Sequence, residues 1–317
     1  MGTSYAVVHT SPVYSRRGRT DDVLDTVLNT MYLDLRHTTT YSYARPAWDS
    51  FNELWLRPAD DYRQTLLAFE LNITPKPDLR YRRDSFGNLV HHFHLPSDHT
   101  ELVVDARSSV VTYPVPTPAE VSAQTLPDLR HRFFEFLAPT PRVPLNENWH
   151  RVFGALPLNP GDGLVSYLEA LNSYLHGRFI YAPNTTDVNT PLTEFAGHNS
   201  GVCQDFAHAM LALCRAAGIP ARYVSGYIHS SPNGNEQLIG AEASHAWVEA
   251  FLPGNGWVGF DPTNGCPVTE AHVKIGYGRD YDDLPPVRGL RRGGGGATLE
   301  VTVQVRKSAP LEPAETV

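Results

Sequence analysis

Residues 199–220 read NSGVCQDFAHAMLALCRAAGIP, and this stretch contains the most clearly marked helix of the chain. Asn199 and Ser200 offer side chains that can cap the first turn of a helix, and the run that follows is rich in alanine and leucine. Gly218 and Pro220 mark its end, because glycine favours the conformation that closes a helix and proline cannot continue one. We therefore predict a helix over residues 203–217.

Strand-like segments follow this helix at residues 222–228, 245–252 and 257–260, and a turn at residues 253–256 joins the last two. A helix followed by an antiparallel sheet is typical of an α+β domain. A second helix is predicted upstream because leucines recur at helical spacing, at Leu164, Leu168, Leu171 and Leu175. These leucines are expected to lie in the core.

The sequence before residue 120 is organised differently. It contains short extended runs rich in threonine, tyrosine and β-branched residues, and then prolines at alternate positions, which favour an extended linker. The predicted division is a loosely ordered leader at 1–30, a β-rich domain at 31–112, a linker at 113–119, a core with a C-terminal strand at 120–306 and a frayed tail at 307–317.

Composition excludes some classes of partner. The 317 residues include 26 Lys and Arg against 34 Asp and Glu, so the net charge of −8 repels a phosphate backbone. No run of about 18 apolar residues is present to span a bilayer. Three cysteines are too few, and odd in number, for a disulfide framework. We therefore expect a cytoplasmic protein without nucleic-acid or membrane partners.

Cys203 is the candidate nucleophile. It falls in the predicted first turn of the helix, where unpaired amides and the positive end of the helix dipole favour a thiolate. The alternative for any single cysteine is a small buried thiol, and Cys214, at an apolar position in the same helix, fits that description. A catalytic role requires a base for the thiol and an acceptor that orients the base.

Two later strands supply both groups. His245 begins one predicted strand, and Asp261 ends the next strand just before Pro262. In a simple hairpin register His245 lies opposite a residue somewhat beyond Asp261. We therefore expect that contact between the two side chains requires a register offset or a bulge.

The resemblance to a known family becomes specific at these residues. Three segments resemble, in order and in spacing, the core motifs of the transglutaminase-like superfamily: residues 201–208, 244–249 and 260–264. Residues 52–58 and 86–88 resemble the N-terminal β domain of its bacterial branch, and residues 278–281 and 285–289 resemble a C-terminal motif of that branch. The resemblance runs from about residue 31 to residue 305.

The resemblance implies a papain-like α+β core that uses a Cys-His-Asp triad. Its positions fall on Cys203 as nucleophile, His245 as base and Asp261 as the residue that orients the base. It also implies an enzyme that acts on amide bonds of peptides or proteins. Animal members join glutamine to amines with calcium, whereas other members are peptidases, amidases or deglycosylating enzymes. This chain has no recognisable D-x-D-x-D-G calcium loop, so we expect no metal and no cofactor.

The reaction implied by these residues has two steps. The Cys203 thiolate attacks a carbonyl, an amine or ammonia leaves with a proton from His245, and water or an amine then attacks the thioester. The backbone amide of Cys203 is the expected first oxyanion donor, and Gln204 and Tyr181 are candidates for the second. The missing calcium loop favours hydrolysis over transfer.

Two alternatives stay open at this point. One is a cysteine peptidase or amidase proper, and the other is a scaffold without activity whose β domain binds a partner. The presence of all three triad residues disfavours the scaffold.

Histidines elsewhere have a structural interpretation. They cluster at His91, His92, His94 and His99. No cysteine or carboxylate pair completes a metal site there, so a solvated or domain-facing strand is expected. Asp205, one turn into the helix, is expected to support the first turn rather than act as an acid.

Overall fold

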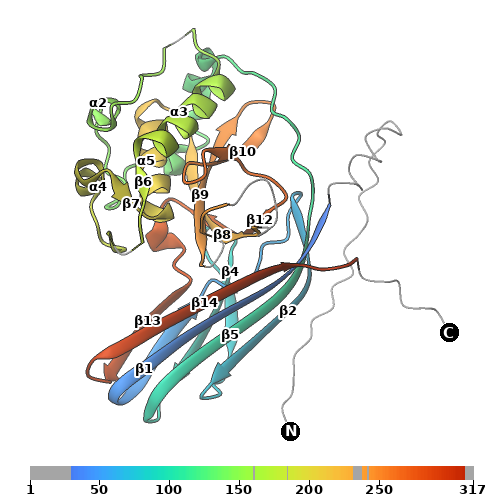
Figure 1. Ribbon diagram of the computed structural model, residues 1–317, viewed down its shortest axis with the longest axis vertical. Coiled ribbons are helices and arrows are strands. Elements are labelled where there is room, and N and C mark those ends of the chain that lie inside the picture. Colours follow the sequence, from blue (N-terminus) through green and yellow to red (C-terminus); the bar gives the residue numbers. More distant parts are fainter. Residues whose placement is uncertain (1–29, 160, 184, 231–237, 241–242, 311–317) are drawn as a thin grey trace, which may run out of the picture.

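The computed structural model describes residues 30–159, 161–183, 185–230, 238–240 and 243–310. The predictions for the leader and for the end of the tail therefore lie outside the described residues. Within them, two β-sheets form two units, one drawn above the other in Figure 1. None of the described helices is long and apolar enough to cross a membrane.

The first unit is a seven-stranded sheet built around one strand of 24 residues, β1. The first half of β1 lies between β5 and β14, and its second half lies between β4 and β13. Its strands are β1 (Met31–Leu54), β2 (Gln64–Thr74), β3 (Arg80–Arg83), β4 (Leu89–Leu95), β5 (His99–Thr112), β13 (Val287–Gly293) and β14 (Ala297–Lys307). The β-rich character predicted for the N-terminal part is therefore present.

The predicted division placed the C-terminal strand in the core. In the structure this strand belongs to the N-terminal sheet instead. The strand expected at residues 298–305 is β14, and it pairs with β1 from Leu33 to Tyr43. The physical reason is that β5 pairs with one edge of β1 and leaves the other edge with unpaired amides and carbonyls. The chain therefore returns to the N-terminal sheet, and Ser308 N–H donates to the carbonyl of Tyr32 at 2.8 Å.

The second unit confirms the α+β prediction. Helices pack on a five-stranded antiparallel sheet of order β11-β10-β9-β8-β12 (Figure 1). Its strands are β8 (Ala221–Ile228), β9 (His245–Leu252), β10 (Gly256–Asp261), β11 (Cys266–Pro267) and β12 (His272–Gly278). The helices are α2 (Trp149–Phe153), α3 (Leu164–Arg178), α4 (Leu192–His198) and α5 (Cys203–Ala216), with short 3-10 turns η1 (Ala123–Leu129), η2 (Phe134–Phe136) and η3 (Tyr281–Asp283). A two-stranded pair, β6 (Ile180–Tyr181) and β7 (Ser200–Gly201), precedes α5.

Helix α5 is buried from Gln204 to Arg215 and packs against β9 and β8. It begins at the predicted residue, but its cap differs from the prediction. Asn199 ends α4 instead, in a left-handed conformation, and the N–H of Val202 donates to the Asp205 carboxylate at 2.9 Å. A Cβ on Gly201 would lie 2.5 Å from that carboxylate, so a side chain there would displace the group that supports the first turn.

The two units meet at β12. Lys274 lies between Asp61 of the N-terminal unit at 2.9 Å and Glu249 of β9 at 2.8 Å, and Gln64 bonds both backbone polar groups of Lys274 at 2.8 Å. Burial alone would raise the pKa of Glu249, but Lys274 and Arg222 outweigh it and lower that pKa to about 2. The interface therefore contains a buried ion network rather than apolar side chains alone.

Replacing Lys274 by Met should destabilise the protein by about 3–5 kcal/mol, because it leaves the buried Glu249 charge with Arg222 as its only cation. The measurement is urea unfolding at pH 7. In the wild-type protein the contribution of Glu249 to the free energy of unfolding should be fully present above pH 4.5. It should be lost as the pH falls towards 2, since the pKa of Glu249 is lowered on folding. Arg80→Ala, which breaks an exposed pair with Asp78, is the control and should leave the midpoint unchanged. Equal midpoints for the two variants would contradict this account of the interface.

Candidate active site

Three separate elements bring the predicted triad together. Cys203 is the first residue of α5, His245 is the first residue of β9, and Asp261 is the last residue of β10. The His245 and Asp261 side chains are fully buried, and Nε2 of the histidine lies 2.8 Å from Oδ2 of the aspartate. Cys203 is only partly buried, unlike the other two residues.

The contact between His245 and Asp261 needs no bulge, contrary to the expectation from the sequence. Strands β9 and β10 pair regularly from Leu252 with Gly256 to Val248 with Phe260. Continuing this register by one pair places Asp261 opposite Trp247. His245 lies two residues before Trp247 on the same face of the sheet, so the carboxylate reaches the imidazole as a diagonal neighbour.

The Asp261 carboxylate is held by several donors. Oδ1 accepts from the backbone N–H groups of Thr263 at 3.0 Å and Asn264 at 3.2 Å, and Oδ2 accepts from the Asn264 side-chain amide at 2.7 Å. His272 Nε2 lies 3.3 Å from the same Oδ2. Burial would raise the pKa of Asp261, but His245 and the other donors outweigh it and lower that pKa, so the group is ionised.

The surroundings of His245 favour the charged form of its imidazole. Burial lowers its pKa, but the charge and hydrogen bond of Asp261, followed by the neighbouring Cys203, raise the pKa to about 10. The Cys203 thiol lies 3.9 Å from the carbonyl of Ser244, the residue before the histidine. Nε2 is engaged by Asp261, which leaves Nδ1 as the ring nitrogen that can serve the thiol. Cys203, His245 and Asp261 thus lie in the order that a nucleophile, its base and the residue that orients the base require.

The two side chains named as second oxyanion donors differ in their surroundings. The Gln204 amide donates to the carbonyl of Val188 at 3.1 Å, so one of its two N–H groups is engaged. Tyr181 lies in β6, paired with Gly201, and its pKa is raised by burial and by Cys203. Tyr181 is thus within electrostatic reach of the nucleophile.

One group of side chains could hold a metal ion. Ligand atoms of Asp261, Cys266 and His272 lie within 4.8 Å of one another, the single such group of three found among the described residues. The histidines predicted to be structural have separate partners: His94 stacks on Phe51 and His99 lies 3.1 Å from Ser50.

His272 and Asn264 are the residues that sequence reasoning missed. Asn264 follows Asp261 by three residues in the matched motif, so an Asx-type contact to the carboxylate was available as a signal. His272 had no local signal, because β12 and β10 are separated in the sheet order by β9 and β8.

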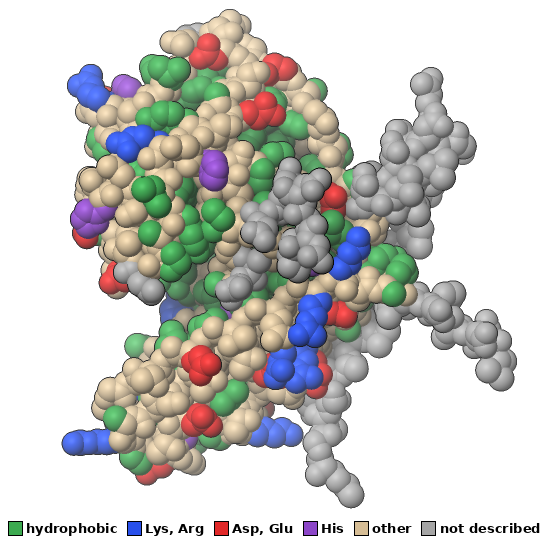
Figure 2. Space-filling view, viewed as in Figure 1, with side chains coloured by type: hydrophobic (Ala, Val, Ile, Leu, Met, Phe, Trp, Pro, Cys, Tyr) green, Lys and Arg blue, Asp and Glu red, His purple; other side chains and the backbone are tan. Residues whose placement is uncertain are grey.

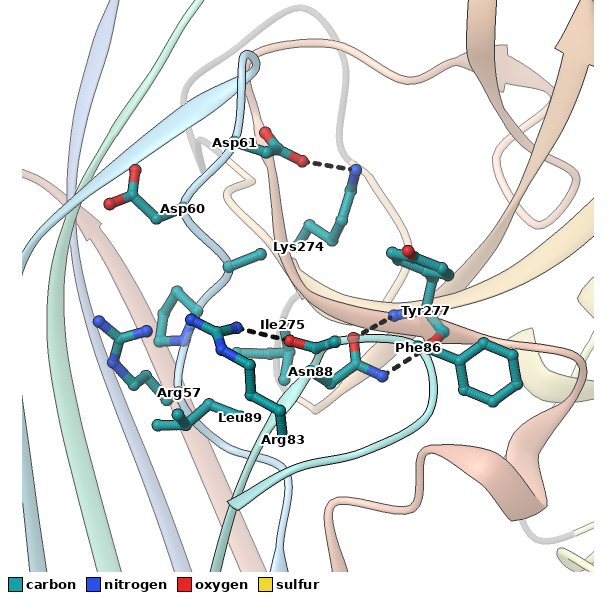
Figure 3. A pocket seen from close by; sticks show the side chains of 13 residues that line it. Arg57, Asp60, Asp61, Arg83, Phe86, Asn88, Leu89, Lys274, Ile275 and Tyr277 are labelled. Carbon is teal, nitrogen blue, oxygen red and sulfur yellow. Dashed lines mark hydrogen bonds and ion pairs between the residues drawn. The ribbon is translucent and has the colours of Figure 1, made fainter. Parts of the chain in front are cut away.

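A separate cavity of about 250 Å³ lies where the N-terminal unit meets β12. Figure 3 shows Arg57, Asp60 and Arg83 around it, with Lys274 bonded to Asp61. None of the three triad residues lines this cavity, so it is distinct from the candidate catalytic site.

Comparisons with known proteins agree with this geometry. The family described as the bacterial transglutaminase-like N-terminal region matches residues 33–111, and the transglutaminase-like superfamily matches residues 159–262, a span that contains the whole triad. A protein-glutamine gamma-glutamyltransferase of Pseudomonas aeruginosa is 39% identical over 104 residues, which are 30% of this chain and 16% of that enzyme.

Two further relatives span most of the chain. A solved structure from Cytophaga hutchinsonii, named as a candidate cysteine protease, shares the fold with a TM-score of 0.71 and 23% identity, over 91% of this chain and 93% of its own. A Mycobacterium leprae protein of uncharacterised function is 35% identical over 281 residues, which are 86% of this chain and 98% of that protein. The chain belongs to the transglutaminase-like superfamily.

Proposed function

We propose that this protein is a cysteine-dependent enzyme that cleaves or transfers acyl groups at amide bonds of peptides or proteins. The observation that carries the proposal is the buried pair of His245 and Asp261 beside a partly exposed Cys203 at the start of α5. A scaffold without activity has no need for a buried charged pair next to a partly exposed thiol. Burying such a pair costs several kcal/mol unless its geometry is good.

The first step follows from the positions of the three side chains. The Cys203 thiolate attacks the amide carbonyl and forms a C–S bond, which gives a tetrahedral intermediate, and the C–N bond then breaks. His245 Nδ1 gives its proton to the leaving amine or ammonia. Asp261 keeps the imidazole oriented and stabilises its charge without taking the proton itself. In the second step His245 removes a proton from water or an amine, which then attacks the thioester carbonyl. A C–O or C–N bond forms, the C–S bond breaks, and the Cys203 thiolate and the His245 imidazolium are restored as the product leaves.

The oxyanion of the tetrahedral intermediate needs donors close to Cys203. The backbone N–H of Cys203 lies in the first turn of α5, where amides have no acceptor within the helix. Tyr181 is the better of the two candidates for a second donor, since the Gln204 amide is already bound to Val188.

Hydrolysis is the first candidate for the fate of the thioester, and transfer to an amine is the second. The relative named as a glutamine gamma-glutamyltransferase supports transfer, but the match covers only 16% of that enzyme. The Cytophaga hutchinsonii neighbour bears a protease name, and at 23% identity its likeness concerns the fold. A cysteine peptidase or amidase proper uses the same first step and belongs to the same proposal.

The proposed partner is a peptide or protein rather than a nucleic acid or a membrane. The net charge is −8, and basic side chains on the N-terminal sheet lie beside acidic ones, as in the group of Arg36, Asp105 and Arg107. On the face shown in Figure 2 the basic side chains of this sheet are interspersed with acidic ones. We propose a cytoplasmic location because three cysteines are too few, and odd in number, for a disulfide framework.

Cys203 should react with iodoacetamide much faster than Cys214 or Cys266 at neutral pH. Only Cys203 lies beside a protonated imidazole at a helix N-terminus, whereas burial raises the pKa of Cys214 to about 12. Peptide mapping by mass spectrometry after brief labelling measures the three rates. Similar labelling of all three thiols would remove the thiolate from the mechanism.

Incubation with a glutamine-containing protein, with and without a labelled primary amine, should yield an acyl product that depends on Cys203. Mass spectrometry separates amine incorporation from hydrolysis, and we expect hydrolysis to dominate. Cys203→Ala should abolish both products while the fold is kept, and Cys214→Ala should retain them. Incorporation that exceeds hydrolysis at millimolar amine would assign the chain to transfer, and turnover by Cys203→Ala would refute the nucleophile.

A further inference from the structure

Two imidazoles meet the same oxygen of Asp261. His245 Nε2 lies 2.8 Å from Oδ2 and His272 Nε2 lies 3.3 Å from it, and all three side chains are fully buried. His272 is the first residue of β12, and its ring centroid lies 6.5 Å from that of His245. The mechanism described above uses His245 and gives His272 no role.

The hydrogen bond between Nε2 of His272 and Asp261 has a direction that follows from the partner of Nδ1, the other ring nitrogen. The backbone N–H of Thr269 donates to Nδ1 of His272 at 3.1 Å. A backbone N–H can only donate, so Nδ1 carries no proton. The proton of the ring therefore lies on Nε2, which donates it to Asp261.

The same observation argues against a metal at Asp261, Cys266 and His272. A metal bound at Nε2 would require the ring proton to lie on Nδ1, because a ligating imidazole is neutral and donates through its other nitrogen. That proton would face the N–H of Thr269. The group suits a proton donor to the carboxylate better than a metal centre.

We propose that His272 is a positioning residue for the triad, an inference that rests on the proposed cysteine chemistry. By donating to Oδ2 it holds the carboxylate plane towards His245 and withdraws part of the negative charge that His245 experiences. The titratable groups that face His245 are Cys203 from α5, Asp261 from β10 and His272 from β12. Without the donor, Asp261 would hold the proton on His245 more tightly, and the imidazolium would be a weaker acid for the leaving amine.

Two variants separate the donor from the shape of the ring. His272→Phe keeps a planar ring without a donor, and His272→Gln can place an amide N–H near the position of Nε2. Both lose the ring nitrogen that accepts from Thr269, so this loss cannot explain a difference between them, and function kept by His272→Gln without a ring points to the donor. The rate of Cys203 alkylation by iodoacetate, followed against pH, needs no substrate. This alkylation rate should fall at high pH as His245 loses its proton, and we call this part of the profile the alkaline limb.

The alkaline limb of His272→Phe should move upwards by about 0.5–1 pH unit, and its turnover of a protein substrate should fall about tenfold. His272→Gln should lie close to wild type in both measurements. A wild-type profile for His272→Phe, or equal shifts in both variants, would overturn the proposal. Slow alkylation of Cys203 in the wild-type protein would instead refute the proposed function.

The tautomer of His272 gives a test that does not depend on a variant folding. In the wild-type protein labelled with ¹⁵N-histidine, the NMR spectrum of His272 should show a proton on Nε2 and none on Nδ1 at pH 7. A proton on Nδ1 would overturn the proposal, because His272 could then not donate to Asp261.

Discussion

The hydrogen bond between His245 and Asp261 is the contact on which the rest of the site depends. Both side chains are removed from water, and neither charge could be buried alone without a large desolvation cost. Asp261 is further held by backbone amides of the turn after β10. Regular pairing of β9 with β10 delivers the contact, and α5 places Cys203 near His245, with its thiol 3.9 Å from the carbonyl of Ser244.

Much of the site could be predicted because its signals are local or carried by motifs. The Ala- and Leu-rich run of α5 and the strand that begins at His245 were recognisable from a few neighbouring residues. The diagonal contact between His245 and Asp261 was not recognisable, since periodicity alone does not show which side chains of neighbouring strands touch. The return of β14 to β1 and the approach of His272 to Asp261 depend on pairings between distant segments, for which no local pattern exists.

Strand β12 connects the catalytic site with the N-terminal unit. Its first residue, His272, donates to Asp261, and Lys274, two residues later, is held by Gln64 and Asp61 of the other sheet. Strand β12 lies at the edge of its sheet, where β8 is its one neighbouring strand. Its position therefore depends on β8 and on the contacts of Lys274 with Gln64 and Asp61. The N-terminal unit therefore supports a strand that carries part of the triad's surroundings, which gives a physical reason for the two units to occur together.

The protonation state of His245 is the most direct test of the central claim, because the first step assigned to the triad begins from an imidazolium. NMR of ¹⁵N-histidine in the wild-type protein, titrated from pH 6 to 10.5, should show His245 protonated beyond pH 8, since Asp261 raises its pKa to about 10. In Asp261→Asn the pKa should fall well below that of the wild-type protein, because burial lowers it and the carboxylate no longer raises it, while the smaller contribution of Cys203 remains. A neutral His245 at pH 7.5 in the wild-type protein would contradict the account.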